Sequence, residues 1–113
     1  MKEHKITLLN LPKISLNKWY AGSHWTKRLE IKRVYETIIK PQFKKVFPKT
    51  GVYKVSYDLY FKGKLLDCSN CVAMVKLIED VIFEDDKPDI VTEIKIRSMK
   101  DKNERVEIKV DKI

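Results

Sequence analysis

The sequence predicts an α+β domain with two layers: a mixed, mainly antiparallel, four-stranded sheet and two helices that cover one of its faces. Two patterns predict this class. Alternating apolar and polar residues mark four strands, and apolar residues at helical spacing mark two helices between them. The 113 residues suit one core rather than two, so we expect a single domain over residues 1–113, in the order β-α-β-α-β-β.

The first half of the chain begins with a predicted strand at 5–11, which Pro12 ends. Residues 13–24 mix polar, aromatic and small side chains, so they are expected to form a loop. The segment 25–47 has apolar residues at helical spacing, with basic residues on its other side. Pro41 is expected to end or kink this helix, because proline has no N–H to donate.

The second half of the chain adds three strands and a helix. A strand at 52–63 directs alternate apolar residues to the core, namely Val55, Tyr57, Leu59 and Phe61. A helix is expected over about 69–82, followed by strands at 89–98 and 104–113. The inward residues of these strands are Ile90, Ile94 and Ile96, then Val106, Ile108 and Val110. Residues 99–103 are predicted to join the two strands as a hairpin loop.

The composition is typical of a soluble globular protein, with 43% hydrophobic and 35% charged residues. No segment approaches the roughly 20 apolar residues of a membrane span. The first ten residues also lack the long apolar run of a signal peptide. We therefore expect a cytoplasmic protein with no membrane partner, whose cysteines stay reduced.

Cys68 and Cys71 form a C-x-x-C motif. A zinc site would need a second pair of ligands, which His4 and His24 do not supply at a suitable spacing. A redox motif normally sits on a βαβ unit of thioredoxin type, a pattern that the sequence does not display. The simplest interpretation is two reduced thiols near the start of a helix.

The charge is unevenly distributed along the chain. The formal net charge is +8, with +11 in residues 1–64 and −3 in residues 65–113. A basic half beside an acidic half suggests a bound polyanion. Nucleic acid is favoured because its phosphates bind clustered lysine and arginine with release of counterions. The alternative is a basic surface that only keeps the protein soluble.

Carboxylates concentrate around the second predicted helix. Asp67 precedes it, Asp80 lies one turn after Lys76, and Asp85 and Asp86 follow the helix. If the turn doubles back, Asp86 can approach Asp67 and Asp80, and carboxylates gathered in this way usually need a cation. Mg²⁺ suits oxygen ligands, and it can activate a water molecule at a phosphodiester while a lysine stabilises the transition state.

The same residues also have an ordinary structural interpretation. Lys76 and Asp80 could form a surface ion pair, and Asp67 or Ser69 could cap the helix. The polar side of the helix is expected to carry Ser69, Ala73, Lys76, Glu79 and Asp80.

At these positions the sequence resembles the RusA family of Holliday-junction resolvases. The family has a D-x-D-N motif at a helix start, then a lysine, an aspartate one turn later and a D-D pair before a strand. The matching residues are Asp67, Asn70, Lys76, Asp80, Asp85 and Asp86. An S-x-N-x-x-Y element before the first helix is matched by Ser15, Asn17 and Tyr20.

The resemblance implies a homodimer with one Mg²⁺ site for each of two opposed strands of a four-way DNA junction. Asp67 and Asp86 would be the metal ligands and Lys76 the catalytic lysine, with Asn70 and Asp80 as supporting residues. Two departures matter: Ser69 replaces the second aspartate of the motif, and Lys76 lies six residues after Asn70, where better-known members have three.

These departures leave two alternatives for the metal site. Either Asp80 or Asp85 takes over as a ligand, or the site is weak or inactive. Ser69 could hold a metal-bound water, although a hydroxyl is a poorer Mg²⁺ ligand than a carboxylate.

A basic and aromatic segment around the first helix is the predicted DNA contact. Its basic residues would bind phosphates and its aromatic residues would stack on unpaired bases, or else cap the core. The candidate DNA-binding residues are Asn17, Lys18, Trp19, Tyr20, Lys27, Arg28, Lys32 and Arg33.

Three functions are therefore compatible with the sequence. The first is a structure-selective, Mg²⁺-dependent endodeoxyribonuclease that resolves four-way junctions in DNA recombination or repair. The second is a DNA-branch-binding protein of the same fold that does not cleave. The third is a small protein-interaction module whose charge serves solubility only.

Overall fold

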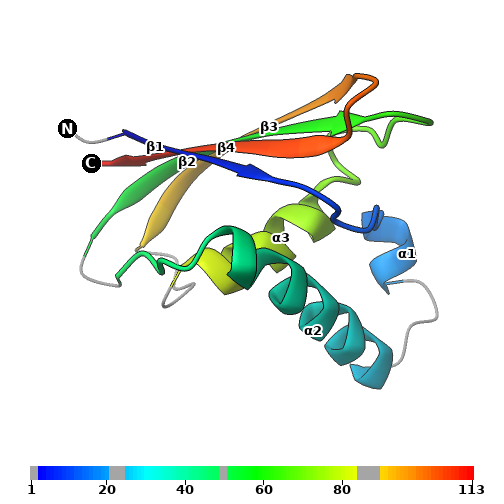
Figure 1. The fold of residues 1–113 in the computed structure, drawn as a ribbon, viewed down its shortest axis with the longest axis horizontal. Helices are drawn as coiled ribbons and strands as arrows, with labels where there is room; N and C mark the ends of the chain where they lie inside the picture. The colour runs from blue at the N-terminus through cyan, green and yellow to red at the C-terminus, as the bar shows by residue number, and fades with distance from the viewer. Residues whose placement is uncertain (1–2, 21–24, 49–50, 84–89) are drawn as a thin grey trace.

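The computed structural model of the chain describes residues 3–20, 25–48, 51–83 and 90–113. The elements follow one another as β1 (Glu3–Leu8), α1 (Leu16–Tyr20), α2 (Trp25–Gln42), β2 (Tyr53–Phe61), α3 (Val72–Ile82), β3 (Val91–Lys100) and β4 (Arg105–Lys112). The strands form one sheet in the order β1-β4-β2-β3 (Figure 1). The predicted α+β class and the order β-α-β-α-β-β are confirmed, with the short helix α1 inside the predicted loop as an addition.

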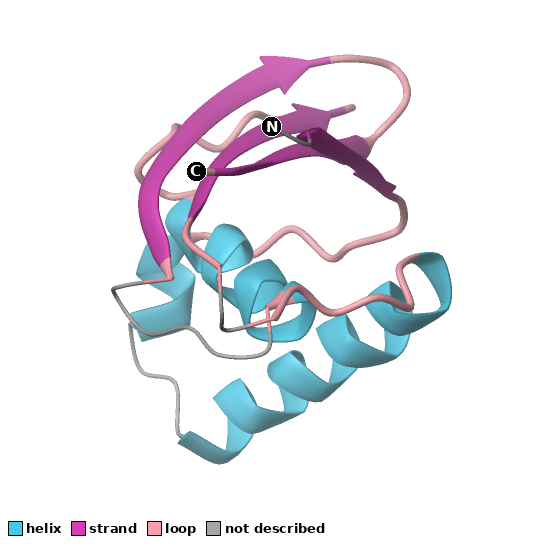
Figure 2. Cartoon of the chain, turned by 90° about the vertical axis from the view of Figure 1, so that its left-hand side faces the viewer, coloured by secondary structure: helices cyan, strands magenta, loops and turns pink. Residues whose placement is uncertain are grey.

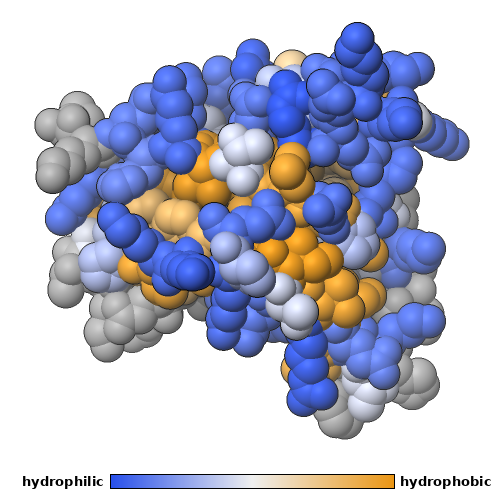
Figure 3. All heavy atoms as spheres, viewed as in Figure 1, coloured by the Kyte–Doolittle hydropathy of each residue, from blue (hydrophilic) through white to orange (hydrophobic). Residues whose placement is uncertain are grey.

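The helices lie on one face of the sheet (Figures 1 and 2). Helix α3 lies nearest the sheet and α2 packs on α3 from the other side, so α3 is covered on two sides. Helix α2 ends at Gln42, one residue after Pro41, and the Gln42 side chain bonds both the N–H and the carbonyl of Leu9. On the face seen in Figure 3, polar side chains dominate and apolar surface shows between the sheet and α2.

Strand β2 is the centre of the sheet and of the core. Its inward residues, Val55, Tyr57, Leu59 and Phe61, are all buried, as the alternation predicts. Strand β4 pairs with β2 on one side and runs antiparallel, and its predicted inward residues Val106, Ile108 and Val110 are also buried. Strand β3 pairs with β2 on the other side and runs parallel to it.

The predicted hairpin between the last two strands is wrong. Strands β3 and β4 flank β2 instead of pairing with each other, and residues 101–104 cross over the end of β2. The N–H of Asp101 donates to the carbonyl of Phe61 at 3.0 Å, and the N–H of Lys62 donates to the Glu104 carboxylate at 3.1 Å. Placing β2 between two partners buries its apolar face more completely than an edge position would.

Three side-chain placements also differ from the sequence prediction. Ile94 shares the core face with Val55 but is 44% exposed, because β3 is an edge strand with a neighbour on one side only. Ala73 and Glu79, expected on the polar side of α3, both face inward, since α3 is covered on two sides. Ala73 is buried, and Glu79 accepts a hydrogen bond from the Tyr57 hydroxyl at 2.8 Å. Burial and the Glu79 charge raise the pKa of Tyr57 well above its ordinary value.

The sheet face away from the helices is polar and carries ion pairs. Arg97 on β3 makes a two-pronged contact with Asp58 on β2, at 2.8 and 3.0 Å. The two residues are direct neighbours in the parallel register. The hydrogen bond from Arg97 is the main cause that lowers the pKa of Asp58 below its ordinary value of 3.8.

This ion pair predicts an acid-sensitive contribution to stability. Because the pKa of Asp58 is lower in the folded protein, the contribution is fully present above the ordinary pKa of 3.8 and is lost as the pH falls through the folded-state value. Asp58→Asn should therefore lower the free energy of unfolding near neutral pH, and the difference from the wild type should disappear in strong acid. Urea denaturation across this pH range measures it. Asp111→Asn on β4 is the control, and the same pH dependence in that variant would contradict the assignment.

Candidate functional site

Helices α1, α2 and α3 enclose a groove with a volume of about 440 Å³. Its lining combines three cationic side chains, one carboxylate and three apolar or aromatic side chains. These are Trp19 from α1, Arg28, Leu29 and Lys32 from α2, and Lys76, Leu77 and Asp80 from α3. The groove therefore brings together the predicted catalytic lysine, one predicted metal ligand and three of the predicted DNA-binding residues.

Helix α1 supplies one wall of the groove. Its first turn is capped by Ser15, whose hydroxyl accepts a hydrogen bond from the Lys18 N–H at 3.1 Å. The N–H of Leu16 donates to the carbonyl of Asn70 at 3.0 Å, which ties α1 to the turn that precedes α3. The position brings Trp19 against the core, with the Arg28 guanidinium 5.9 Å from the centre of its ring system.

Lys76 and Asp80 lie one turn apart on α3 and line the same groove, as their spacing predicts. The Asp80 carboxylate pairs with the Lys32 ammonium of α2 at 3.5 Å. Half of the Lys32 side chain is exposed, so this pair contributes little to stability. The ion pair instead fixes the positions of the Asp80 carboxylate and the Lys32 ammonium beside Lys76.

Asp67 lies at the other end of α3, before its first turn. Its carboxylate accepts a hydrogen bond from the Asn70 N–H at 2.9 Å, and its carbonyl accepts from the N–H of Cys71. Asp67 thus caps the turn that leads into the helix. At a rise of about 1.5 Å per residue, the nine steps from Cys71 to Asp80 span roughly 13 Å of helix axis. The structure therefore does not bring Asp67 and Asp80 together.

Several predicted site residues lie elsewhere or beyond the described chain. Asp85 and Asp86 fall outside the described residues. Among the residues that the structure describes, no three histidine, cysteine, aspartate or glutamate side chains form a group able to hold a metal ion. Lys18 of α1, Lys27 and Arg33 of α2, and Ser69 and Asn70 in the turn before α3 do not line the groove. Asn17 and Tyr20 belong to α1, and their side chains lie outside the described part of the structure.

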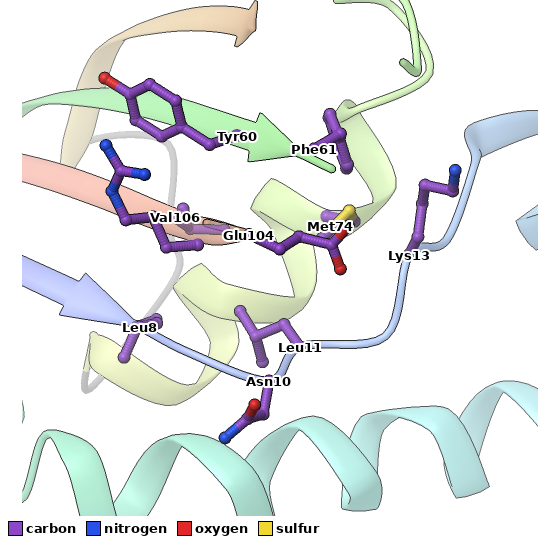
Figure 4. Close-up of a pocket in the computed structure, with 10 residues that line it drawn as sticks. Leu8, Asn10, Leu11, Lys13, Tyr60, Phe61, Met74, Glu104 and Val106 are labelled. Atoms are coloured by element: carbon purple, nitrogen blue, oxygen red, sulfur yellow. The ribbon is translucent and has the colours of Figure 1, made fainter. Parts of the chain in front are cut away.

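A second hollow lies at the end of the sheet, and it is too small to be a substrate site. Figure 4 shows the side chains around it, among them Leu8, Met74 and Val106. Its volume is about 20 Å³, which is enough for about one water molecule.

No helix in the described part of the chain is long and apolar enough to cross a membrane.

No protein-family model matches the chain, and a search of curated proteins finds no significant match. The likeness to RusA resolvases therefore remains a prediction from the motif residues.

The sequence reasoning missed two parts of the groove. Helix α1 was expected to be a loop, although Ser15 three residues before Lys18 is a capping signal for a short helix. Leu29 and Leu77 form apolar lining, and Leu29 is 39% exposed. An apolar lining between charged side chains is typical of sites that bind a ligand with both flat and charged parts.

The hydrogen bond between the Asn70 N–H and the Asp67 carboxylate predicts that Asp67 contributes to the stability of the fold, apart from any role in binding metal. Asp67→Ala should lower the free energy of unfolding by up to about 1 kcal/mol, because the Asn70 N–H loses its side-chain acceptor and keeps only the carbonyl of residue 67. Asp67→Asn keeps a side-chain oxygen, so its stability should stay within a few tenths of a kcal/mol of the wild type. Urea denaturation measures both variants. Equal stability of Asp67→Ala and the wild type would show that the cap contributes nothing.

Proposed function

We propose that the chain is a structure-selective, Mg²⁺-dependent endodeoxyribonuclease of RusA type that acts on branched DNA such as a four-way junction. The observation that carries the proposal is the content of the groove. Lys76 and Asp80 share it with Arg28 and Lys32, so a candidate catalytic lysine lies among groups that bind phosphate. The proposal includes a homodimer, with one site for each of two strands, and a cytoplasmic location.

Six of the seven residues that line the groove have a role in this proposal. Arg28 and Lys32 bind the DNA backbone, and Trp19 and Leu29 offer surface for an unpaired base. Lys76 stabilises negative charge on the phosphodiester that is cut. Asp80 positions Lys32 through their ion pair.

The described carboxylates do not make a complete Mg²⁺ site. Asp67 lies before the first turn of α3 and Asp80 lies in its last turns, so the site would need Asp85 or Asp86 as well. When bound, Mg²⁺ would supply an activated water and charge stabilisation at the phosphate. Of the described residues, Asp67 is the first candidate ligand, since it is exposed and its carboxylate has further acceptor capacity beyond the Asn70 bond.

The separation of Asp67 and Asp80 favours a second candidate function. A protein of this fold that binds DNA branches without cutting them would need the basic and aromatic lining of the groove and no metal site. The ion pair between Asp80 and Lys32 is compatible with that function, because it occupies the carboxylate with a cation.

Cleavage of a synthetic four-way junction with and without Mg²⁺ tests the proposal. We expect metal-dependent nicking that is lost in Asp67→Asn and in Asp86→Asn. In Lys76→Ala the single-turnover rate should fall by about 10²-fold or more, while junction affinity stays within about twofold, because the lysine acts on the transition state.

Lys44→Ala, which changes an exposed lysine that does not line the groove, is the control and should keep full activity. Tight binding of the junction without nicking would contradict the nuclease proposal and support the branch-binding function instead. A loss in Lys76→Ala that is confined to affinity would contradict the catalytic role of Lys76.

The DNA-binding role of the groove predicts a change in salt dependence. Lys32→Ala should weaken junction binding several-fold at low salt and reduce the slope of log affinity against log salt concentration by about 0.9, the value for one lost phosphate contact. Lys32→Arg should restore both. Fluorescence anisotropy at several salt concentrations measures the slope. Lys95→Ala, on the opposite face of the sheet, is the matched control, and an equal change there would argue against the groove.

A further inference from the structure

The C-x-x-C motif occupies a position that the sequence did not reveal. Strands β2 and β3 are parallel neighbours, and α3 connects them, so β2-α3-β3 is a βαβ unit. Cys68 and Cys71 lie in the turn that leads from β2 into α3. The structure therefore supplies the βαβ context that a dithiol redox motif normally has, at the start of the connecting helix.

The two thiols differ in their access to solvent. Both cysteines are free, Cys68 is exposed, and Cys71 is completely buried. An exposed sulfur can meet a partner from solution, whereas a buried sulfur can react only with its neighbour. This difference matches the division between an attacking and a resolving thiol.

The turn holds the two cysteines close enough to be joined. The N–H of Cys71 donates to the carbonyl of Cys68 at 3.2 Å, which closes a four-residue turn. In such a turn the first and last Cα atoms lie less than about 7 Å apart, and disulfides span about 4.4–6.8 Å. The spacing of the two Cα atoms in this turn is therefore compatible with a disulfide between Cys68 and Cys71.

Strand β3 lies directly beside the Cys68 sulfur, and the chain beside the Cys71 sulfur is bonded to β3. The Cys68 thiol is 3.6 Å from the carbonyl oxygen of Ile96, and the Cys71 thiol is 3.9 Å from that of Leu66. Leu66 is itself tied to β3, because its carbonyl accepts a hydrogen bond from the Ser98 hydroxyl. The turn is thus held against β3, the edge strand of the sheet.

We propose that Cys68 and Cys71 form a redox-active dithiol that exchanges with external disulfides. Cys68 attacks one sulfur of a low-molecular-weight disulfide, which forms a mixed disulfide and releases the first thiol. Cys71 then attacks the Cys68 sulfur, which forms the Cys68–Cys71 disulfide and releases the second thiol. The protein loses two electrons and two protons, and the external disulfide gains both as two thiols. This activity is independent of the proposed nuclease.

The wild-type protein provides the first test. The full chain is equilibrated with mixtures of oxidised and reduced glutathione, free thiols are alkylated, and the products are counted by mass spectrometry. We expect both thiols to disappear together as an intramolecular disulfide, and dithiothreitol to restore both. Accumulation of a stable mixed disulfide on Cys68 with Cys71 still free would overturn the proposal, and so would resistance of both thiols to oxidation.

Two variants test the order of attack. Cys71→Ala should stop at the mixed disulfide on Cys68, since the resolving thiol is missing. In Cys68→Ala the buried Cys71 should react at least about tenfold more slowly with oxidised glutathione. Circular dichroism confirms that each variant is folded. Equal reaction rates of the two variants in their folded state would overturn the assignment of roles.

Discussion

The parallel pairing of β2 with β3 is the constraint on which the rest of the structure depends. Parallel neighbours cannot be joined by a tight turn, so the chain must return along the sheet before it starts β3. Helix α3 makes that return. Its first residues therefore follow the end of β2, where the turn with Asp67 and the two cysteines lies, and its last turn carries Asp80 toward the opposite end.

The enclosed position of α3 decides which of its residues can act on a ligand. The side toward the sheet is fixed by packing and by the bond between Tyr57 and Glu79. Lys76 and Asp80 project instead toward α2 and α1, where Arg28, Lys32 and Trp19 meet them. The groove is thus assembled from three helices that the sheet holds in place. Its cationic excess follows from the basic first half of the chain, which supplies α2.

Periodicity in the sequence predicted the local structure well. The alternation in β2 and β4 identified their buried residues, and the helical spacing located α2 and α3 within a few residues. Periodicity could not predict the strand order, because alternation shows which face of the sheet a residue occupies but not which strands are neighbours. For that reason the hairpin prediction failed, and the βαβ unit around the C-x-x-C motif was missed.

The candidate site was predictable in part for the same physical reason. Lys76 and Asp80 are four residues apart on a helix, so local geometry alone brings them to one groove. The approach of Lys32 to Asp80 depends on how α2 packs on α3, and the sequence does not encode that contact in any spacing. The distance between Asp67 and Asp80 likewise follows from helix length rather than from the motif that they share.

In the function that we propose, the groove between α1, α2 and α3 faces the DNA. Amide chemical-shift mapping during titration with a four-way junction tests this orientation. We expect the largest shifts at Arg28, Lys32 and Lys76. Shifts concentrated at Lys95, Arg97 and their neighbours on the opposite face of the sheet would contradict it.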